Sequence, residues 1–311
     1  TMAESVETEV KSAPTELLHL TYEGNFQLEC NATVIQCRTV QTNSPEEEED
    51  DEEEETKNSS AGVEIQLDQT TMHPQGGGQP TDIGTLSFGN DENNNSTISI
   101  EKVTVDRDTG IVTHFGTADK TTLSSLLETG TCVQVSVDPD QRQILSECHT
   151  AGHVVDSAMA RCNRMLPPSK GYHFLDGPYV EYKGSIPVEE RAEVLTNLKA
   201  AFSDLVEEDI VTCIETLSKE EAEERCNRLA QNFDMSLYGN DSVRVVTVAG
   251  WPCPCGGTHV KSTGDLKERK WGVTGIKSKK GVVRVKYGPN PNNKKTVLSS
   301  TVVETSYSGA S

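Results

Sequence analysis

The chain has 311 residues, which is enough for one large domain or two ordinary ones. Its formal net charge is −21, but residues 46–55 (EEEEDDEEEE) supply ten of the 49 acidic residues, and the other 39 against 28 basic residues leave −11. No run of 18 apolar residues occurs, which excludes a transmembrane helix. Because the N-terminus has no signal-peptide pattern, we expect a cytoplasmic protein, outside membranes, whose nine cysteines stay reduced.

Short β-rich runs separated by turn residues dominate the first part of the chain. Such a pattern is typical of a small antiparallel barrel, so we predict a β-barrel-like domain over residues 16–138. The predicted strands lie within 16–37, 63–71, 82–89, 96–106, 110–116 and 132–138. Runs of like charge repel one another and stay solvated, so we expect disorder in the acidic insertion 42–61. Residues 1–15 are a predicted disordered N-terminus, and 90–95 a hairpin tip.

Helical periodicity then alternates with strands over residues 139–298. Asp138 as N-cap and Pro139 at the first helical position start a helix that we expect to end near Arg164, before Pro167. Further helices are predicted at 187–205 and at 218–231, a strand at 243–250, a loop at 251–260 and a hairpin at 271–288. Residues 299–311 form a predicted disordered tail. The fold class is therefore α+β, with the barrel-like domain first.

Two histidines four residues apart in the first helix, His149 and His153 of HTAGH, share one helical face. At the edge of the apolar stripe they should be half-buried. Such a pair can be incidental, and Thr150 stands where an HExxH peptidase has its glutamate. The distant CPCGGTH adds Cys255 and His259, which completes a tetrahedral ligand set for one zinc ion per chain. Cys253 could replace Cys255, and four filled positions would suit a structural site as well as a catalytic one.

Three further stretches have both a functional and an ordinary reading. The loop formed by Gly76, Gly77, Gly78 and Gln79 is either a flexible turn or a close-approach loop that offers an amide to a ligand. The aromatic stretch 170–184, which contains His173 as an alternative ligand, either packs in the core or stacks on nucleobases. Residues 261–295 hold eleven basic residues against two acids, a net +9. This strip is either a solvated hairpin or a surface for RNA.

Three motifs together, HTAGH at 149–153, CGGTH at 255–259 and GGGQPTDIG at 76–84, resemble those of the freestanding alanyl-tRNA editing proteins (the AlaX group, long form). That group is related to the editing domain of alanyl- and threonyl-tRNA synthetases, and the resemblance covers about residues 16–298. It implies an N-terminal barrel-like domain with the GGGQP loop, followed by an editing (deacylase) domain at 139–298. His73 and the acidic insertion depart from the group, and the absence of synthetase class II motifs makes aminoacylation unexpected.

The resemblance implies zinc-dependent hydrolysis of the ester that joins a wrong amino acid, above all serine and also glycine, to tRNA(Ala). The zinc ligands would be His149, His153, Cys255 and His259, and the partner would be the tRNA(Ala) acceptor end. The sequence does not give the oligomeric state, and we favour a monomer. Thr150 and Gln79 are candidate donors to substrate. Asp156, one turn beyond His153, could orient an imidazole, assist the water, or simply lie on the helix surface.

The basic strip offers Lys277, Lys279 and Lys280 as contacts to RNA. The role of zinc, as Lewis acid or as substrate anchor, does not follow from the residues. Two alternatives to this esterase stay open: a non-catalytic RNA-binding module with a structural zinc, and an enzyme that acts on another acyl group.

Overall fold

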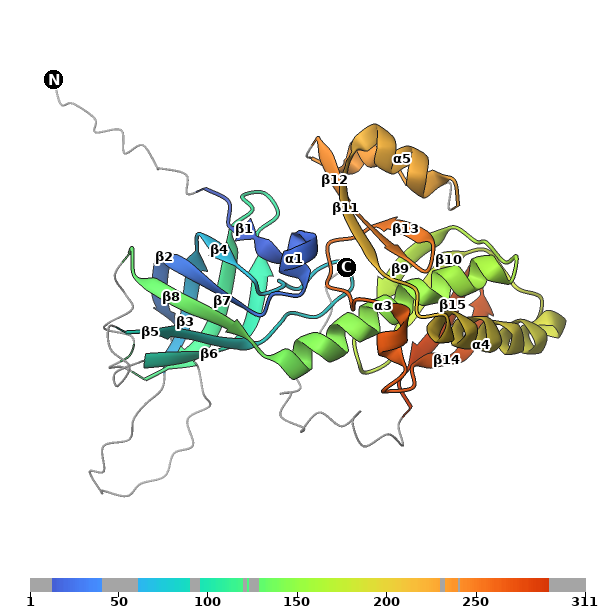
Figure 1. The fold of residues 1–311 in the computed structure, drawn as a ribbon, viewed down its shortest axis with the longest axis horizontal. Coiled ribbons are helices and arrows are strands. Elements are labelled where there is room, and N and C mark those ends of the chain that lie inside the picture. The colour runs from blue at the N-terminus through green and yellow to red at the C-terminus, as the bar shows by residue number, and fades with distance from the viewer. Residues whose placement is uncertain are drawn as a thin grey trace, which may run out of the picture.

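The computed structural model describes residues 13–40, 61–89, 96–119, 122, 129–229, 233–239 and 241–290 (Figure 1). The hairpin tip 90–95, the tail 299–311 and most of the two segments predicted to be disordered (1–15 and 42–61) lie outside these residues. Residues 13–15 and 61 of these two segments belong to the described structure. Thr15 is buried and bonded to the Leu67 carbonyl, and Ala61 opens a barrel strand.

Six antiparallel strands close into a barrel in the order β2-β3-β7-β6-β5-β8, which confirms the predicted barrel. Alternate residues along each strand point inward, and Ile65, Leu86 and Val135 have no exposed surface. A short parallel pair and one helical turn accompany the barrel near its N-terminus. The strands are β2 (Glu29–Val40), β3 (Ala61–Leu67), β5 (Gly84–Phe88), β6 (Ser96–Val105), β7 (Val112–Ala118) and β8 (Cys132–Val137), with β1 (Glu16–Leu17), β4 (Gln69–Thr70) and α1 (Tyr22–Asn25) beside them.

Two long helices and a four-stranded sheet form the second core. Helices α3 (Pro139–Arg161) and α4 (Arg191–Glu207) lie on one side of the sheet, whose strand order is β14-β15-β10-β9 (Figure 1). Phe202 and Leu198 of α4 pack with Val283 and Val285 of β15 in this core. The sheet strands are β9 (Pro168–Tyr172), β10 (Tyr179–Lys183), β14 (Gly272–Lys279) and β15 (Val282–Gly288).

A smaller sheet, in the order β11-β12-β13, carries the short helix α5 (Lys219–Asn227). The capping box of Ser218 and Glu221, read from the sequence, is present at the start of α5. The strands are β11 (Cys213–Ser218), β12 (Ser242–Val248) and β13 (Trp251–Pro254). The chain thus folds as mixed α+β, and among the described residues no helix is long and apolar enough to cross a membrane.

Several predicted element boundaries were wrong. Helix α4 begins at Arg191 rather than at 187, and α5 ends at Asn227 rather than at 231. Helix α3 ends at Arg161 rather than near Arg164, because Asn163 adopts a left-handed conformation (φ 53°) that ends the helix. Residues 251–254, predicted as loop, form β13. Ala249 and Gly250, with φ of 49° and 82°, make the tight turn before it. Proline is tolerated in β13 because this strand lies at the edge of its sheet.

Candidate metal centre

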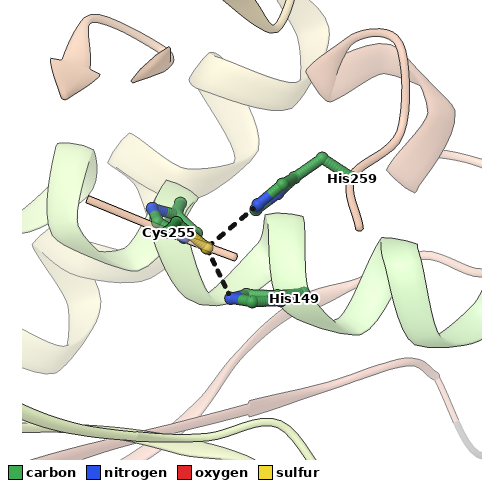
Figure 2. A group of neighbouring side chains, drawn as sticks. His149, Cys255 and His259 are labelled. Atoms are coloured by element: carbon green, nitrogen blue, oxygen red, sulfur yellow. Dashed lines mark hydrogen bonds between the residues drawn. The ribbon is translucent and has the colours of Figure 1, made fainter. Parts of the chain in front are cut away.

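The four residues predicted as zinc ligands converge, although more than 100 residues separate their two motifs. Helix α3 presents His149 and His153, and the loop after β13 presents Cys255 and His259. Figure 2 shows the Cys255 sulfur facing the rings of His149 and His259. One ligand atom from each lies within 4.8 Å of the others. The Cys255 Sγ is 3.4 Å from Nε2 of both His149 and His259. His149 and His153 are buried rather than half-buried as predicted, since the loop covers this face of the helix, and His259 is buried as well.

The spacing of these atoms fits a small tetrahedral ion. With zinc–sulfur and zinc–nitrogen bonds of about 2.3 and 2.0 Å, the edge between sulfur and nitrogen is about 3.5 Å. The observed 3.4 Å separations match that edge. Soft thiolate and borderline imidazole ligands are also the donors that zinc selects. These two sulfur–nitrogen separations and the donor types fit an ion such as zinc, and the four residues would hold it.

Gln79 of the glycine loop fixes the orientation of the His149 ring. Its side-chain oxygen lies 2.6 Å from Nδ1 of His149 and also accepts the Thr258 N–H at 3.0 Å. Since an amide oxygen can only accept, Nδ1 carries the proton and Nε2 keeps its lone pair toward Cys255. The Gln79 amide nitrogen donates to Thr258 Oγ1 at 2.9 Å, so both of its polar atoms have protein partners.

Thr150 performs the same function for His259. Its hydroxyl lies 3.3 Å from Nδ1 of His259 and accepts the Val260 N–H at 3.1 Å. Because a hydroxyl can both donate and accept, this bond holds the His259 ring whichever of the two atoms carries the proton, and Nε2 faces Cys255. Thr150 and Gln79, predicted as donors to substrate, are both fully buried and bonded to the ligands or their loop. Such bonds orient a metal ligand and set its basicity.

His153 differs from the other two rings. Its Nδ1 is buried and has no hydrogen-bond partner among the described residues. Its ring centroid lies 5.2 Å from that of His149 and 4.9 Å from that of His259. A buried, unpaired imidazole nitrogen is costly, so a ring left this way fits a ligand whose partner is an ion.

Burial keeps the histidines in the neutral form that binds metal. It lowers the pKa of His149 and His259 well below the ordinary value, with neighbouring imidazoles as a further cause. Burial likewise lowers the pKa of His153 to about 4. Burial raises the pKa of the Cys255 thiol, and the Arg244 guanidinium opposes that rise. A cation at the centre would favour the thiolate further.

Several residues that hold the metal loop gave no sequence signal. Asn25 of α1 donates to the His259 carbonyl at 2.8 Å and accepts the His259 N–H at 3.0 Å. Arg244 of β12 donates to the Cys255 carbonyl and, at 2.8 Å, to the Leu20 carbonyl. Both side chains bond the ends of the CGGTH loop to distant parts of the chain. A lone asparagine in a short turn or a lone arginine in a strand has no spacing that could reveal this.

Glycine is required at one position of the loop. A Cβ on Gly257 would lie 2.2 Å from the His149 ring and 2.5 Å from the Gln79 side-chain oxygen. A Cβ on the neighbouring Gly256 would meet no atom within 4 Å. In the GGGQP loop, Gly78 has φ of +83°, and its carbonyl accepts the His173 N–H at 2.8 Å. Gly76 pairs with Gln79 across the turn, with Gly77 (φ +58°) between them.

Other predicted site residues lie elsewhere. Asp156 is buried and accepts from the Tyr182 hydroxyl at 2.6 Å, so this carboxyl is neither on the surface nor bonded to an imidazole in the described structure. Cys253 and His173 are not part of the four-residue cluster. His173 instead stacks on His149 at 4.3 Å, and its Nδ1 lies 2.5 Å from the Tyr287 hydroxyl. Lys277, Lys279 and Lys280 are exposed on the β14–β15 hairpin.

The fold and site define a class of protein: a six-stranded barrel followed by an α+β unit that brings three histidines and a cysteine into a zinc-sized cluster. Residues 243–286 match the family model described as the threonyl and alanyl tRNA synthetase second additional domain. This segment contains Cys255 and His259 but not the two histidines of α3.

Relatives of this chain have names that agree with the motifs. A Saccharomyces cerevisiae protein, provisionally named alanyl-tRNA editing protein alaX, is 27% identical over 68% of this chain and 47% of its own length. The alanyl-tRNA editing protein AlaX-M of Methanosarcina barkeri is 29% identical over 65% of the chain and 79% of its own length. An alanine–tRNA ligase of a Nocardioides species is 29% identical over 67% of the chain but 22% of its own length.

These matches confirm the resemblance read from the motifs: the chain is a homologue of proteins named for alanyl-tRNA editing. It spans about half the length of the yeast relative and about a fifth of the ligase. The shared part therefore corresponds to one portion of the ligase, whereas it covers most of the M. barkeri editing protein.

Proposed function

We propose that this protein hydrolyses the ester bond of tRNA(Ala) that carries a wrong amino acid, serine foremost and also glycine, with one zinc ion held by His149, His153, Cys255 and His259. The observation that carries the proposal is the four-residue cluster, in which Gln79 and Thr150 orient two of the rings. The names of the M. barkeri and yeast relatives support the substrate class. When bound, zinc would polarise the ester carbonyl or anchor the amino acid.

The protein's own residues would position the metal ligands and exclude water from the surroundings of the metal cluster. Gln79, Thr258 and Ser146 form a buried chain of hydrogen bonds, with Ser146 Oγ 2.8 Å from Thr258 Oγ1. This chain connects the glycine loop of the barrel to α3 behind the metal loop. Because Gln79 and Thr150 bond the ligands, we assign them positioning roles rather than direct contact with substrate. Asp156, bonded to Tyr182, would support the helix that carries both ligand histidines.

One observation favours a second function. Four protein ligands fill a tetrahedral site, as in structural zinc sites, whereas catalytic sites usually keep one position for water or substrate. The alternative is therefore an RNA-binding module in which zinc only holds the CGGTH loop against α3. The four-residue cluster is compatible with both functions. An assay of ester hydrolysis distinguishes between them.

The test is deacylation of Ser-tRNA(Ala) by the metal-loaded protein, with zinc content measured on the same samples. We expect release of serine by the wild type, and loss of both zinc and release in His153→Ala. Correctly charged Ala-tRNA(Ala) is the substrate control. Intact tRNA binding and full zinc content without any release of serine or glycine would contradict the esterase and leave the binding module.

A further inference from the structure

A ladder of flat groups lies on the sheet face that the helices do not cover. The rings of Phe174 and Tyr172 stack with centroids 4.7 Å apart and 19° between planes. Tyr172 and Tyr179 stack at 5.3 Å and 18°, and the Arg284 guanidinium lies 4.8 Å from the Tyr179 centroid. All three rings are half-buried rather than buried. We call these four side chains the aromatic ladder.

The strand register places the ladder opposite the helices. Tyr179 pairs with Tyr172 of β9 on one side and with Lys286 of β15 on the other, so these side chains share one face. The alternate residues Val180 and Val285 are buried in the core that α3 and α4 complete. The ladder face is therefore the outer face of the sheet, where a large partner can reach it.

The same face is strongly basic. In one cross-strand row Lys170 of β9 is followed by Glu181, Arg284 and Lys277. The row beyond it holds Lys183 and Lys279 on either side of Val282. Together with Lys286, six basic side chains share this face with two carboxylates: Glu181, which bonds Arg284, and Asp176, which accepts from the Tyr172 hydroxyl at 3.1 Å. The whole protein has a net charge of −21. Charge complementarity therefore favours a polyanion here.

The ladder adjoins the metal cluster through a single residue. His173 lies between Tyr172 and Phe174 in the chain, but its ring is buried and stacks on His149 at 4.3 Å. Successive side chains of an extended segment point to opposite sides. A ligand on the ladder would thus lie across one backbone thickness from the cluster.

We propose that the aromatic ladder is a stacking platform for the unpaired nucleotides next to the ester-bearing end of an RNA. Aromatic rings within a basic groove are how proteins bind single-stranded nucleic acid without reading its sequence. Phe174, the end ring of the ladder, would receive a base, and Lys170 and Lys286 would contact phosphates. The identity of the RNA rests on the proposed function, and the stacking of an unpaired end does not.

The test compares uncharged tRNA(Ala) with the same tRNA trimmed of its unpaired 3′ nucleotides, by equilibrium binding to the metal-loaded protein. For intact tRNA, Phe174→Leu should weaken binding about fivefold to 150-fold, the loss expected for one stacked base. Tyr172→Leu should also weaken binding, because Tyr172 stacks on Phe174 and holds that ring in place. For trimmed tRNA the same substitutions should change nothing. Tyr172→Phe keeps the ring and should bind as the wild type does.

A matched control is Phe115→Leu, since Phe115 is a half-buried ring on the barrel with the Lys102 ammonium 5.6 Å from its centroid. It should leave both affinities unchanged. Equal losses on intact and trimmed tRNA, or no loss on intact tRNA, would overturn the platform and make the ladder a packing feature of the sheet. Absence of ester hydrolysis with the intact-versus-trimmed difference retained would reject the proposed function alone.

Discussion

At the scale of single residues, the two glycines of CGGTH differ in whether a larger side chain would fit. There is no space for a Cβ at Gly257, whereas there is space for one at Gly256. An alanine at Gly257 would place its Cβ 2.2 Å from the His149 ring, so the ring or the loop must move. We expect Gly257→Ala to lower zinc affinity at least tenfold, because the His149–Gln79 bond lies in the path of the new methyl group. Competition with a chromophoric chelator measures this loss.

The neighbouring glycine is the control for that experiment. A Cβ on Gly256 meets no atom within 4 Å, so Gly256→Ala should bind zinc as the wild type does. Both variants change the same loop by one methyl group. Equal losses in the two would mean that loop stiffness, and not the space beside His149, limits metal binding.

The buried carboxyl of Asp156 should make the stability of the protein depend on pH. Burial raises the pKa of this carboxyl to about 7, which exceeds its value of about 3.9 in an unfolded chain. The folded state therefore binds the proton more tightly, and the stability that this proton contributes is present below pH 4 and lost as pH rises through 7. Asp156→Asn stays neutral, so its free energy of unfolding should gain on the wild type between pH 4 and 7, by on the order of 1.4 kcal/mol per pKa unit.

Urea unfolding of both proteins over that pH range measures the difference, in which any effect of pH on metal binding that is common to both cancels. The exposed turn residue Asp108 supplies the control, and Asp108→Asn should show no such gain. A constant difference between Asp156→Asn and the wild type across the range would show that Asp156 is ionised throughout.

At the scale of elements, one buried ion pair joins the glycine loop to the metal helix. Arg142 of α3 donates to both carboxylate oxygens of Asp82 and, at 2.7 Å, to the Thr71 carbonyl. Asp82 has no exposed surface and lies three residues after Gln79. Because removal of either partner leaves a buried charge, Arg142→Met or Asp82→Asn should destabilise the protein by about 3–5 kcal/mol.

Denaturant unfolding tests this expectation, and zinc titration of the same variants should show weaker binding, since Gln79 loses its anchor. The exposed pair of Glu224 on α5 and Arg228 just after it is the control, and its loss should cost at most about 1 kcal/mol. Similar losses from the two pairs would contradict the assignment of the buried pair as the link between loop and helix.

The elements that the sequence predicted well are those with local signals. The start of α3 follows from Asp138 and Pro139, and that of α5 from the capping box, because the partners lie within one helical turn. Strand β13 was missed because Pro252 and Pro254 read as loop. An edge strand tolerates them, but edge position depends on the whole sheet.

At the scale of the whole molecule, the four residues of the cluster were predictable because each half-site has its own spacing, one turn of helix in HTAGH and a tight turn in CGGTH. Their supports were not, since Asn25 and Arg244 reach the loop from positions 234 and 11 residues away in sequence. The roles of Thr150 and Gln79 depended equally on contacts across the two halves of the chain. The identity of the metal ligands can be read from short sequence motifs. The orientation of their rings depends on contacts that form only in the folded protein.

The basic hairpin leads to a prediction about how the whole protein meets RNA. Lys277, Lys279 and Lys280 are exposed, and the first two share the ladder face with Arg284. Changing all three to glutamate should abolish action on tRNA and flatten the salt dependence of binding by about 0.7–0.9 per lost phosphate contact. Hydrolysis of a small seryl ester without RNA should persist, because the charges lie outside the metal cluster. Reversal of Lys199 on α4, Lys219 on α5 and Arg228 just after α5 makes the same net change elsewhere and should leave tRNA binding nearly intact. Equal loss on the small ester and on tRNA would contradict a polyanion role for the hairpin.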